Sequence, residues 1–405
     1  MKHYLSAYAI FFFTFPLRFL PYRAIHALGN ALGLLLYHCI PHFRKRALSN
    51  LALAKTLKLT NPQIRKLAKE SFQNLCITCL EYPKLASEKN IHRLVTCENP
   101  ELAQSYIDRG QGVIFFCGHQ ANWELLFIEG TSRMPGVAIG RPIKNPVLYK
   151  WVKKIRQSQG GTIIEPKNAL KEGLRALRQG KFLGIVGDQG MPESSYSYPF
   201  FGTRAFTTTA PALLAQRTGA PLITATIVRQ KGRYSIHYSN PIDPNQDTHA
   251  LMDAALKHLE ASIAKHPGQW LWQHNRWKQE TPHNVYYRFR KDPFLVIVSN
   301  PDHLSHLKTF RKIYPRAHMT IIAPQALASQ IDLPEVEVLS SKPLRDDYRF
   351  KLVYDLANTP NAKSHYTNLA AYEVLSLDDL RALAAHRRPA ENLSDILTKA
   401  VCRAP

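Results

Sequence analysis

Apolar residues form short, regularly spaced runs through the middle of the chain, and amphipathic stretches separate them. The runs have the length of buried parallel strands, and the stretches between them have helical spacing. Expected strands are residues 113–117, 137–140, 162–164, 182–186 and 221–229. Expected helices are residues 61–85, 121–128, 149–157, 169–179 and 210–217. Strands that alternate with helices predict an α/β fold, in which helices cover a mixed, mostly parallel sheet.

The first 40 residues follow a different pattern, because apolar residues dominate two consecutive stretches. Residues 4–20 are apolar and aromatic but contain Pro16 and Arg18, and a second apolar stretch covers residues 24–40. The basic residues 44–46 follow directly. Apolar segments flanked by Lys and Arg are typical of an anchor on the cytoplasmic side of a membrane. We therefore expect residues 1–40 to form a membrane anchor, with one spanning or interfacial helix and one helix along the bilayer surface. A pair of buried core helices is the alternative.

The α/β pattern stops at residues 281–293 and resumes at residue 294. Further strands are expected at residues 294–298, 319–322, 336–339 and 351–356, and a helix at residues 303–314. Residues 41–280 are therefore predicted to form the main domain and residues 281–293 a linker. Residues 294–405 are predicted to form a small Rossmann-like accessory domain.

Composition adds a strong positive charge to this picture. The 405 residues include 53 Lys and Arg against 30 Asp and Glu, a net charge of +23. Such a protein attracts polyanions, among them nucleic acid, an anionic bilayer or an acidic carrier protein. The apolar N-terminus favours the bilayer, and no nucleic-acid recognition motif is present. A generally basic surface without a specific partner is the alternative. The six cysteines are scattered and indicate neither a disulfide framework nor a zinc site.

The most informative segment follows the expected strand 113–117. Gly118 allows a sharp turn, His119 follows it, and Asn122 is a good helix cap that places Glu124 in the first helical turn. With His119 in the turn and Glu124 in the helix, the two side chains can face each other. Glu124 would then accept a hydrogen bond from one imidazole nitrogen and leave the other free to take a proton from an alcohol. This pair predicts acyl transfer to a hydroxyl group, with His119 and Glu124 as catalytic residues.

The segment also resembles a known family. His119 and Glu124 match the H-x4-D/E motif of the glycerolipid acyltransferase superfamily, and the surrounding GH-x2-NWE is similar to the late acyltransferases of lipid A biosynthesis. The resemblance covers roughly residues 44–278. The proline-glutamate-glycine block of glycerol-phosphate acyltransferases is missing from the sequence, which favours the lipid A branch.

The same resemblance implies further substrate-binding residues. Arg141 stands where the family has an arginine, and a guanidinium could hold a phosphate; a surface arginine is the alternative. Asp188 and Gln189 resemble the family's DQ block, and we expect Asp188 to organise the site, by binding Arg141 or the sugar, unless it is only a turn residue. Thr207 and Thr208 precede a helix, where hydroxyls and amides bind anions or simply cap the helix. In the carboxyl-terminal signature, Arg276 lies among Trp270, Trp272 and Trp277, which suits a lipid headgroup interface or a buried aromatic core.

The family resemblance finally implies a complete reaction. Acyl carrier protein would donate a fatty acyl thioester, and a hydroxyl of an acyl chain on a Kdo-bearing lipid A precursor would accept the acyl group. The enzyme would work on the cytoplasmic face of the inner membrane without a metal or bound cofactor. Residues 294–405 faintly resemble half of a heptosyltransferase, and too few residues remain for its second half. The alternatives are another phospholipid or glycolipid acceptor, or a sugar-binding accessory protein related to glycosyltransferases.

Overall fold

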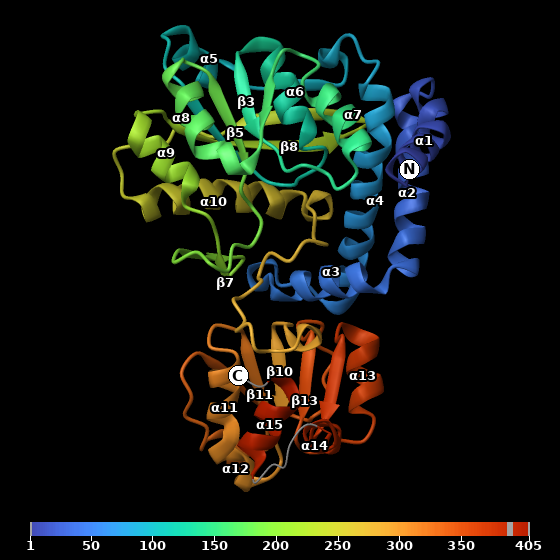
Figure 1. The fold of residues 1–405 in the computed structure, drawn as a ribbon, viewed down its shortest axis with the longest axis vertical. Helices are drawn as coiled ribbons and strands as arrows, with labels where there is room; N and C mark the ends of the chain where they lie inside the picture. Colours follow the sequence, from blue (N-terminus) through green and yellow to red (C-terminus); the bar gives the residue numbers. More distant parts are fainter. Residues whose placement is uncertain (1, 387–391, 404–405) are drawn as a thin grey trace.

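The computed structural model describes residues 2–386 and 392–403, which form two separate main sheets (Figure 1). The larger sheet has seven strands in the order β1-β9-β8-β2-β5-β3-β4. Its neighbours run parallel except for the antiparallel pair β8 and β9, so the predicted mixed, mostly parallel sheet is confirmed. The strands are β1 Val95–Cys97, β2 Val113–Cys117, β3 Gly136–Ile139, β4 Thr162–Ile164, β5 Phe182–Val186, β8 Leu222–Gln230 and β9 Arg233–Tyr238.

Helices cover both faces of this sheet, as the alternation of apolar runs predicts. All five residues of β2 are buried, which explains why the run reads as continuously apolar. The covering helices are α5 Glu101–Asp108, α6 Glu124–Arg133, α7 Pro146–Arg156, α8 Ala169–Arg178, α9 Ala210–Thr218 and α10 Thr248–Lys265. A small antiparallel hairpin, β6 Ser197–Phe200 and β7 Thr203–Phe206, projects from the carboxyl-terminal side of β5.

Four helices precede the sheet. They are α1 Lys2–Thr14, α2 Tyr22–Cys39, α3 Pro41–Leu53 and α4 Asn61–Leu85. Helix α2 lies alongside α4, and two glycines allow this close approach (Figure 1). A Cβ atom on Gly29 would lie 2.6 Å from Ile77 Cγ1, and one on Gly33 would overlap the backbone of Gln73. The contact between α2 and α4 therefore depends on two positions that carry no side chain.

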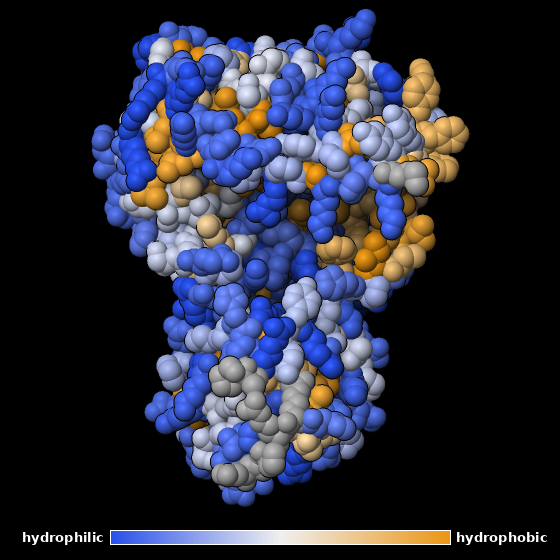
Figure 2. All heavy atoms as spheres, in the orientation of Figure 1, coloured by the Kyte–Doolittle hydropathy of each residue, from blue (hydrophilic) through white to orange (hydrophobic). Residues whose placement is uncertain are grey.

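The N-terminal helices expose an unusual amount of apolar surface. No single helix in the described part of the chain is both long and apolar enough to cross a bilayer; α2 and α3 meet that criterion together but are bent by 96° at their junction. Figure 2 shows the apolar surface as an orange area over α1 and α2. We call it the apolar patch. Its members are Tyr4, Leu5, Tyr8, Ile10, Phe12, Phe13, Phe15, Phe19, Leu28, Leu34 and Leu35.

The second sheet is built entirely from residues after 293. Its five parallel strands have the order β12-β11-β10-β13-β14, so the strand order reverses between β10 and β13. This is the order of a Rossmann-like sheet. The strands are β10 Phe294–Ile297, β11 Met319–Ala323, β12 Val336–Ser340, β13 Leu352–Asp355 and β14 Glu373–Ser376. The helices are α11 Leu307–Ile313, α12 Gln325–Ala328, α13 Ala362–Leu369, α14 Leu377–Ala385 and α15 Leu393–Val401. We call these elements the C-terminal unit; its independence as a domain stays a prediction.

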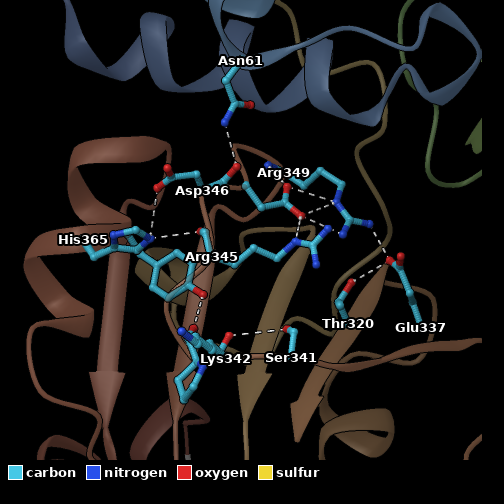
Figure 3. A network of polar contacts seen from close by, with 12 residues as sticks. Asn61, Thr320, Glu337, Ser341, Lys342, Arg345, Asp346, Arg349 and His365 are labelled. Carbon is cyan, nitrogen blue, oxygen red and sulfur yellow. Dashed lines mark hydrogen bonds and ion pairs between the residues drawn. The ribbon is translucent and has the colours of Figure 1, made fainter.

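The C-terminal unit is hydrogen-bonded to α3 and α4 through the loop before β13 (Figure 3). Asn61 Nδ2 donates to the Asp346 carbonyl at 2.8 Å, and Ser49 Oγ donates to the Arg349 carbonyl at 2.6 Å. The Arg349 guanidinium in turn pairs with Glu337 of β12. These bonds connect the loop both to α3 and α4 and to β12 of the second sheet.

We expect Gly33→Ala to destabilise the protein by about 1–3 kcal/mol, because a methyl group at a full contact forces the two helices apart. Thermal unfolding of the purified full-length chain measures the effect. The matched control is Asn30→Ala, on the exposed side of the same helix, which should leave the unfolding temperature nearly unchanged. Equal unfolding temperatures for Gly33→Ala and the wild type would contradict the proposed close contact.

Candidate active site

The sheet itself brings His119 and Asp188 together. Strands β2 and β5 are parallel neighbours, with Cys117 opposite Val186 at their carboxyl ends. His119 and Asp188 each follow their strand by two residues, so both emerge at the same edge of the sheet. Gly118 makes the approach possible, because a Cβ atom there would lie 2.9 Å from Asp188 Oδ2.

Three hydrogen-bond donors hold the Asp188 carboxylate, which is fully buried. His119 Nδ1 lies 2.7 Å from Oδ1, and the His119 backbone N–H donates to Oδ2 at 2.7 Å. Trp270 Nε1 donates to the same Oδ2 at 2.8 Å. With Nδ1 bound to the carboxylate, the other imidazole nitrogen, Nε2, is directed to Gln189, whose side-chain nitrogen lies 3.5 Å away. The arrangement fixes the imidazole tautomer and leaves Nε2 as the nitrogen that can accept a proton.

The hydrogen bond expected from His119 to Glu124 is replaced by the one to Asp188. Glu124 instead forms a two-point ion pair with Arg156 at the end of α7, through bonds of 2.7 Å from Nε and 2.5 Å from a terminal nitrogen. Helix α6 begins at Glu124, and this start directs the carboxylate toward α7. The imidazole binds Asp188 because the neighbouring strands β2 and β5 place the two residues side by side. The Asp188 carboxylate therefore contacts His119 and not Arg141, which was one of its expected partners.

The charges of this cluster shift the pKa values of its members. Burial alone lowers the pKa of His119, but the charge of Asp188 and its hydrogen bond outweigh burial and raise that pKa above the ordinary value. The imidazole correspondingly holds the pKa of the Asp188 carboxyl well below its usual range, against the effect of burial. The neighbouring His274, whose ring centroid lies 6.1 Å from that of His119, has its pKa lowered to about 4 by burial. His274 is therefore neutral at physiological pH, and Asp188 remains ionised.

A pocket of about 370 Å³ opens beside His119. His119, Glu124, Arg141, Arg156 and Gln189 contribute its polar groups. Its other walls are mostly apolar and come from Trp123, Phe127, Ala138, Ile139, Gly140, Ile163, Pro166 and Val186. His119 and Glu124 thus face one cavity even though no hydrogen bond joins them. Pockets of this kind, apolar with a few polar groups, are typical of ligand sites.

A buried carboxylate supports the loop that carries the site. Glu81 of α4 has no exposed surface and binds His26 of α2 at 2.6 Å, Asn122 at 2.6 Å and the Tyr234 hydroxyl at 2.8 Å. Asn122 in turn accepts a hydrogen bond from the backbone N–H of Glu124 at 3.3 Å. Neither Glu81 nor Arg156 was predicted from the sequence as a site residue. A carboxylate on the apolar face of an otherwise amphipathic helix is the signal that could have revealed Glu81.

The remaining predicted residues fall into two groups. Arg141 and Gln189 are exposed at the pocket, as a substrate-binding function requires. Arg276 is instead completely buried: its guanidinium donates to the Phe206 carbonyl at 2.9 Å and to Thr207 Oγ1 at 2.6 Å.

The aromatic residues around Arg276 share its burial. Trp270, Trp272 and Trp277 have no exposed surface, so the carboxyl-terminal signature is an aromatic core and not a headgroup interface. Thr208 is a local cap, since its hydroxyl accepts the backbone N–H of Ala210. Thr207, buried against Arg276, is likewise turned away from solvent.

Comparison with known proteins agrees with the motif. The family model described as bacterial lipid A biosynthesis acyltransferase matches residues 1–279. The chain belongs to this family. The match includes the N-terminal helices and the whole seven-stranded sheet, and it ends before the C-terminal unit.

Individual relatives match different lengths of the chain. The chain is 26% identical over 270 residues to the lipid A biosynthesis lauroyltransferase of Escherichia coli K12, an alignment that covers 64% of this chain and 87% of that protein. It is 27% identical over 277 residues to the palmitoleoyltransferase of the same organism, covering 64% and 86%. It is also 22% identical over 182 residues to a phosphatidylinositol mannoside acyltransferase of Mycolicibacterium smegmatis, covering 43% and 59%.

The His119–Asp188 pair predicts a specific pH dependence of acyl transfer. A base must be neutral to accept a proton, so the rate should fall as the pH drops through the raised pKa of His119. Asp188→Asn removes the charge that raises this pKa, so the acid limb of the rate profile should move to lower pH. Loss of the carboxylate that stabilises the imidazolium should also reduce the maximal rate by about 100-fold or more.

The measurement is the pH profile of kcat/KM for the wild type and Asp188→Asn. Asp108→Asn, an exposed carboxylate on α5, serves as the control and should reproduce the wild-type profile. An unchanged acid limb in Asp188→Asn would show that Asp188 does not set the protonation of the catalytic base.

Proposed function

We propose that this chain transfers a fatty acyl group from acyl carrier protein to a hydroxyl of an acyl chain on a Kdo-bearing lipid A precursor. One observation carries the proposal: in a chain of the lipid A acyltransferase family, an imidazole held by a buried carboxylate opens into a pocket with both apolar and polar walls. This combination provides a base for a hydroxyl group and space for a fatty chain.

The reaction follows from the hydrogen bonds of the site. His119 Nε2 removes the proton from the acceptor hydroxyl, and the resulting oxygen attacks the thioester carbonyl. The tetrahedral intermediate then breaks its carbon–sulfur bond, and the imidazolium returns the proton to the leaving thiol. Asp188 keeps Nδ1 protonated throughout and stabilises the imidazolium between the two proton transfers.

Glu124 contributes through Arg156 in this proposal. Their ion pair lies in the pocket wall, where Arg141 adds a second guanidinium. The negative charge of the tetrahedral intermediate develops in the same pocket, and fixed positive charge stabilises it most effectively when water is excluded. Glu124 therefore holds Arg156 in place, and its own charge raises the pKa of His119 further. Gln189, near Nε2, is placed to orient the acceptor hydroxyl.

The positive charge near the pocket supports acyl carrier protein as the acyl donor. Helix α7, which ends at Arg156, also carries Lys150, Lys153 and Lys154. These lysines lie on the element that forms one wall of the pocket, and the whole chain has a net charge of +23. An acidic carrier protein would be attracted to such a surface and would deliver its thioester close to His119.

Membrane attachment is proposed from the apolar patch. Helix α1 packs on α7: the rings of Phe11 and Trp151 lie 5.3 Å apart, and Asn145 donates to the His3 carbonyl at 2.8 Å. The apolar patch is thus adjacent to the helix that borders the active-site pocket. We place the enzyme on the cytoplasmic face of the inner membrane, with the patch inserted among the lipid chains from which the acceptor comes.

A second acceptor class deserves a test, because the mycobacterial relative is named for the acylation of a phosphatidylinositol mannoside. That name indicates a phosphorylated glycolipid without a lipid A skeleton. Purified wild-type protein can therefore be offered acyl carrier protein thioester with either acceptor, and the products compared by mass spectrometry. Preference for the lipid A precursor supports the proposal, and preference for the other glycolipid refutes its acceptor.

His119→Ala should reduce acyl transfer at least about 100-fold, because the variant lacks the imidazole that takes the hydroxyl proton in the proposed reaction. Glu124→Gln should reduce kcat by a smaller factor, because Arg156 loses its ionic partner but His119 keeps Asp188. Mass spectrometry of the lipid product measures both effects. His237→Ala, an exposed histidine on β9, is the control and should retain wild-type activity. Near-normal rates in His119→Ala would refute the assignment.

A further inference from the structure

A second pocket, of about 570 Å³, lies where α3 and the loop after β5 meet the C-terminal unit. Arg46 of α3 lines one side of it, and Lys351 and Tyr372 of the C-terminal unit line another. The segment that connects the two parts contributes Lys278 and Lys291. Most of these residues lie beyond residue 279, where the match to the acyltransferase family ends. The pocket is therefore a feature that the C-terminal unit adds to the family fold.

Positive charge dominates this pocket. Its five basic side chains face only three carboxylates, those of Glu193, Glu280 and Asp292. Glu280 pairs with Arg316, and Asp292 accepts the backbone N–H of Gln279. Among residues 2–386 and 392–403, no carboxylate oxygen lies within 4.0 Å of a charged nitrogen of the basic residues that line the pocket, which are Arg46, Lys278, Arg290, Lys291 and Lys351.

The cations also repel one another. Burial lowers the pKa of Lys291, and the charge of Arg46 lowers it further. Burial likewise lowers the pKa of Lys351 to about 8, where Arg46 and Lys291 act in the same direction and Asp292 opposes them. Lys351 is only 2% exposed, and its ammonium group donates to Asn275 Oδ1 at 2.8 Å. A bound anion would relieve this repulsion, whereas an empty pocket retains it.

The pocket lies close to the active-site pocket. Gln189 lines the active-site pocket, and Pro192, three residues later, lines the second pocket. Three residues span at most about 11 Å of extended chain. On the other side, Asn275 lines the second pocket and directly follows His274, whose ring lies 6.1 Å from that of His119. The two pockets are therefore close enough for one amphiphilic molecule to contact both.

We propose that the second pocket binds a phosphate group on the sugar head of the acceptor while an acyl chain of the same molecule lies beside His119. This inference rests on the proposed function, since it names the group by which the acceptor is held. A phosphate monoester suits several converging cations better than a carboxylate does, because it carries close to two negative charges at neutral pH. The C-terminal unit thereby becomes part of the acceptor site.

The first test measures anion binding without any acyl transfer. Inorganic phosphate is titrated into the full-length chain by calorimetry at constant ionic strength, with acetate as the comparison anion. We expect the wild type to bind phosphate more tightly than acetate, and Lys278→Gln/Lys291→Gln to weaken phosphate binding at least about tenfold. Arg175→Gln/Arg178→Gln, with the same loss of charge on the exposed face of α8, should bind like the wild type.

Lys351→Met is a second variant, which removes the buried charge while keeping an unbranched side chain of similar length. It should also weaken phosphate binding if it remains folded in a thermal unfolding scan. Equal phosphate binding by the wild type, the double pocket variant and the α8 control would overturn the proposal, as would no binding to any of them.

The second test compares one acceptor with and without its phosphate. In Lys278→Gln/Lys291→Gln, KM for the phosphorylated acceptor should rise at least about tenfold at unchanged kcat, and KM for the dephosphorylated acceptor should stay constant. If phosphate binding is lost but KM does not move, the pocket serves a free phosphate compound and the acceptor assignment fails. If the wild type acylates no acceptor, the proposed function fails with it, while calorimetry still decides whether the pocket binds phosphate.

Discussion

The buried carboxylate of Asp188 is the constraint on which the site depends. An unpaired charge inside a protein is strongly destabilising, so this anion is tolerated only because three donors surround it. Two of the donors belong to His119 and the third to Trp270, which has no exposed surface. Strands β2 and β5 must be in register and position 118 must lack a side chain for these groups to meet. The need to satisfy one charge therefore fixes the orientation of the imidazole.

The loop from Gly118 to Glu124 connects the site to the rest of the fold through its polar side chains. Each of its three polar motif residues binds a different part of the fold: His119 binds Asp188 in the loop after β5, Asn122 binds Glu81 of α4, and Glu124 binds Arg156 of α7. A short segment thus joins the sheet, the helix that packs against α2, and the helix that packs against α1. This explains the spacing of the motif better than a direct contact between its histidine and its acidic residue.

The sequence predicted the parts of this structure that depend on local pattern. The runs that became β2, β4 and β5 were located with their observed bounds. All five residues of β2 are buried, and a strand buried on both faces reads as one continuous apolar run. Helix α10 was missed although Leu251, Ala255, Leu259 and Ile263 recur every fourth residue, so that signal was present. The hairpin of β6 and β7 was missed because it is short and contains a proline, and such a segment reads as a loop.

The hydrogen-bond partners of the site residues could be identified only from the tertiary structure. His119 and Glu124 were recognised as a pair from their spacing, and the structure places both at one pocket. Spacing could not reveal that Asp188, 69 residues away, reaches the imidazole first, because this depends on which strands are neighbours. The pairing of Glu124 with Arg156 likewise depends on how α6 and α7 pack. Arg276 was predicted to bind substrate because aromatic and basic side chains together suit a lipid headgroup interface. In the structure, backbone and hydroxyl oxygens bind its buried guanidinium instead.

The contacts of the buried Arg276 fix the position of the chain between the two pockets. Its guanidinium fixes the segment around residue 276 to Phe206 and Thr207, and Gly190 lies so close to the Arg276 carbonyl that no side chain would fit there. The loop between Gln189 and Pro192 is therefore held against a buried core. This loop lies between the active-site pocket and the second pocket. The aromatic core around Arg276 therefore sets the distance between the two pockets. In the proposed acceptor complex, a residue that touches no substrate would thus determine which hydroxyl reaches His119.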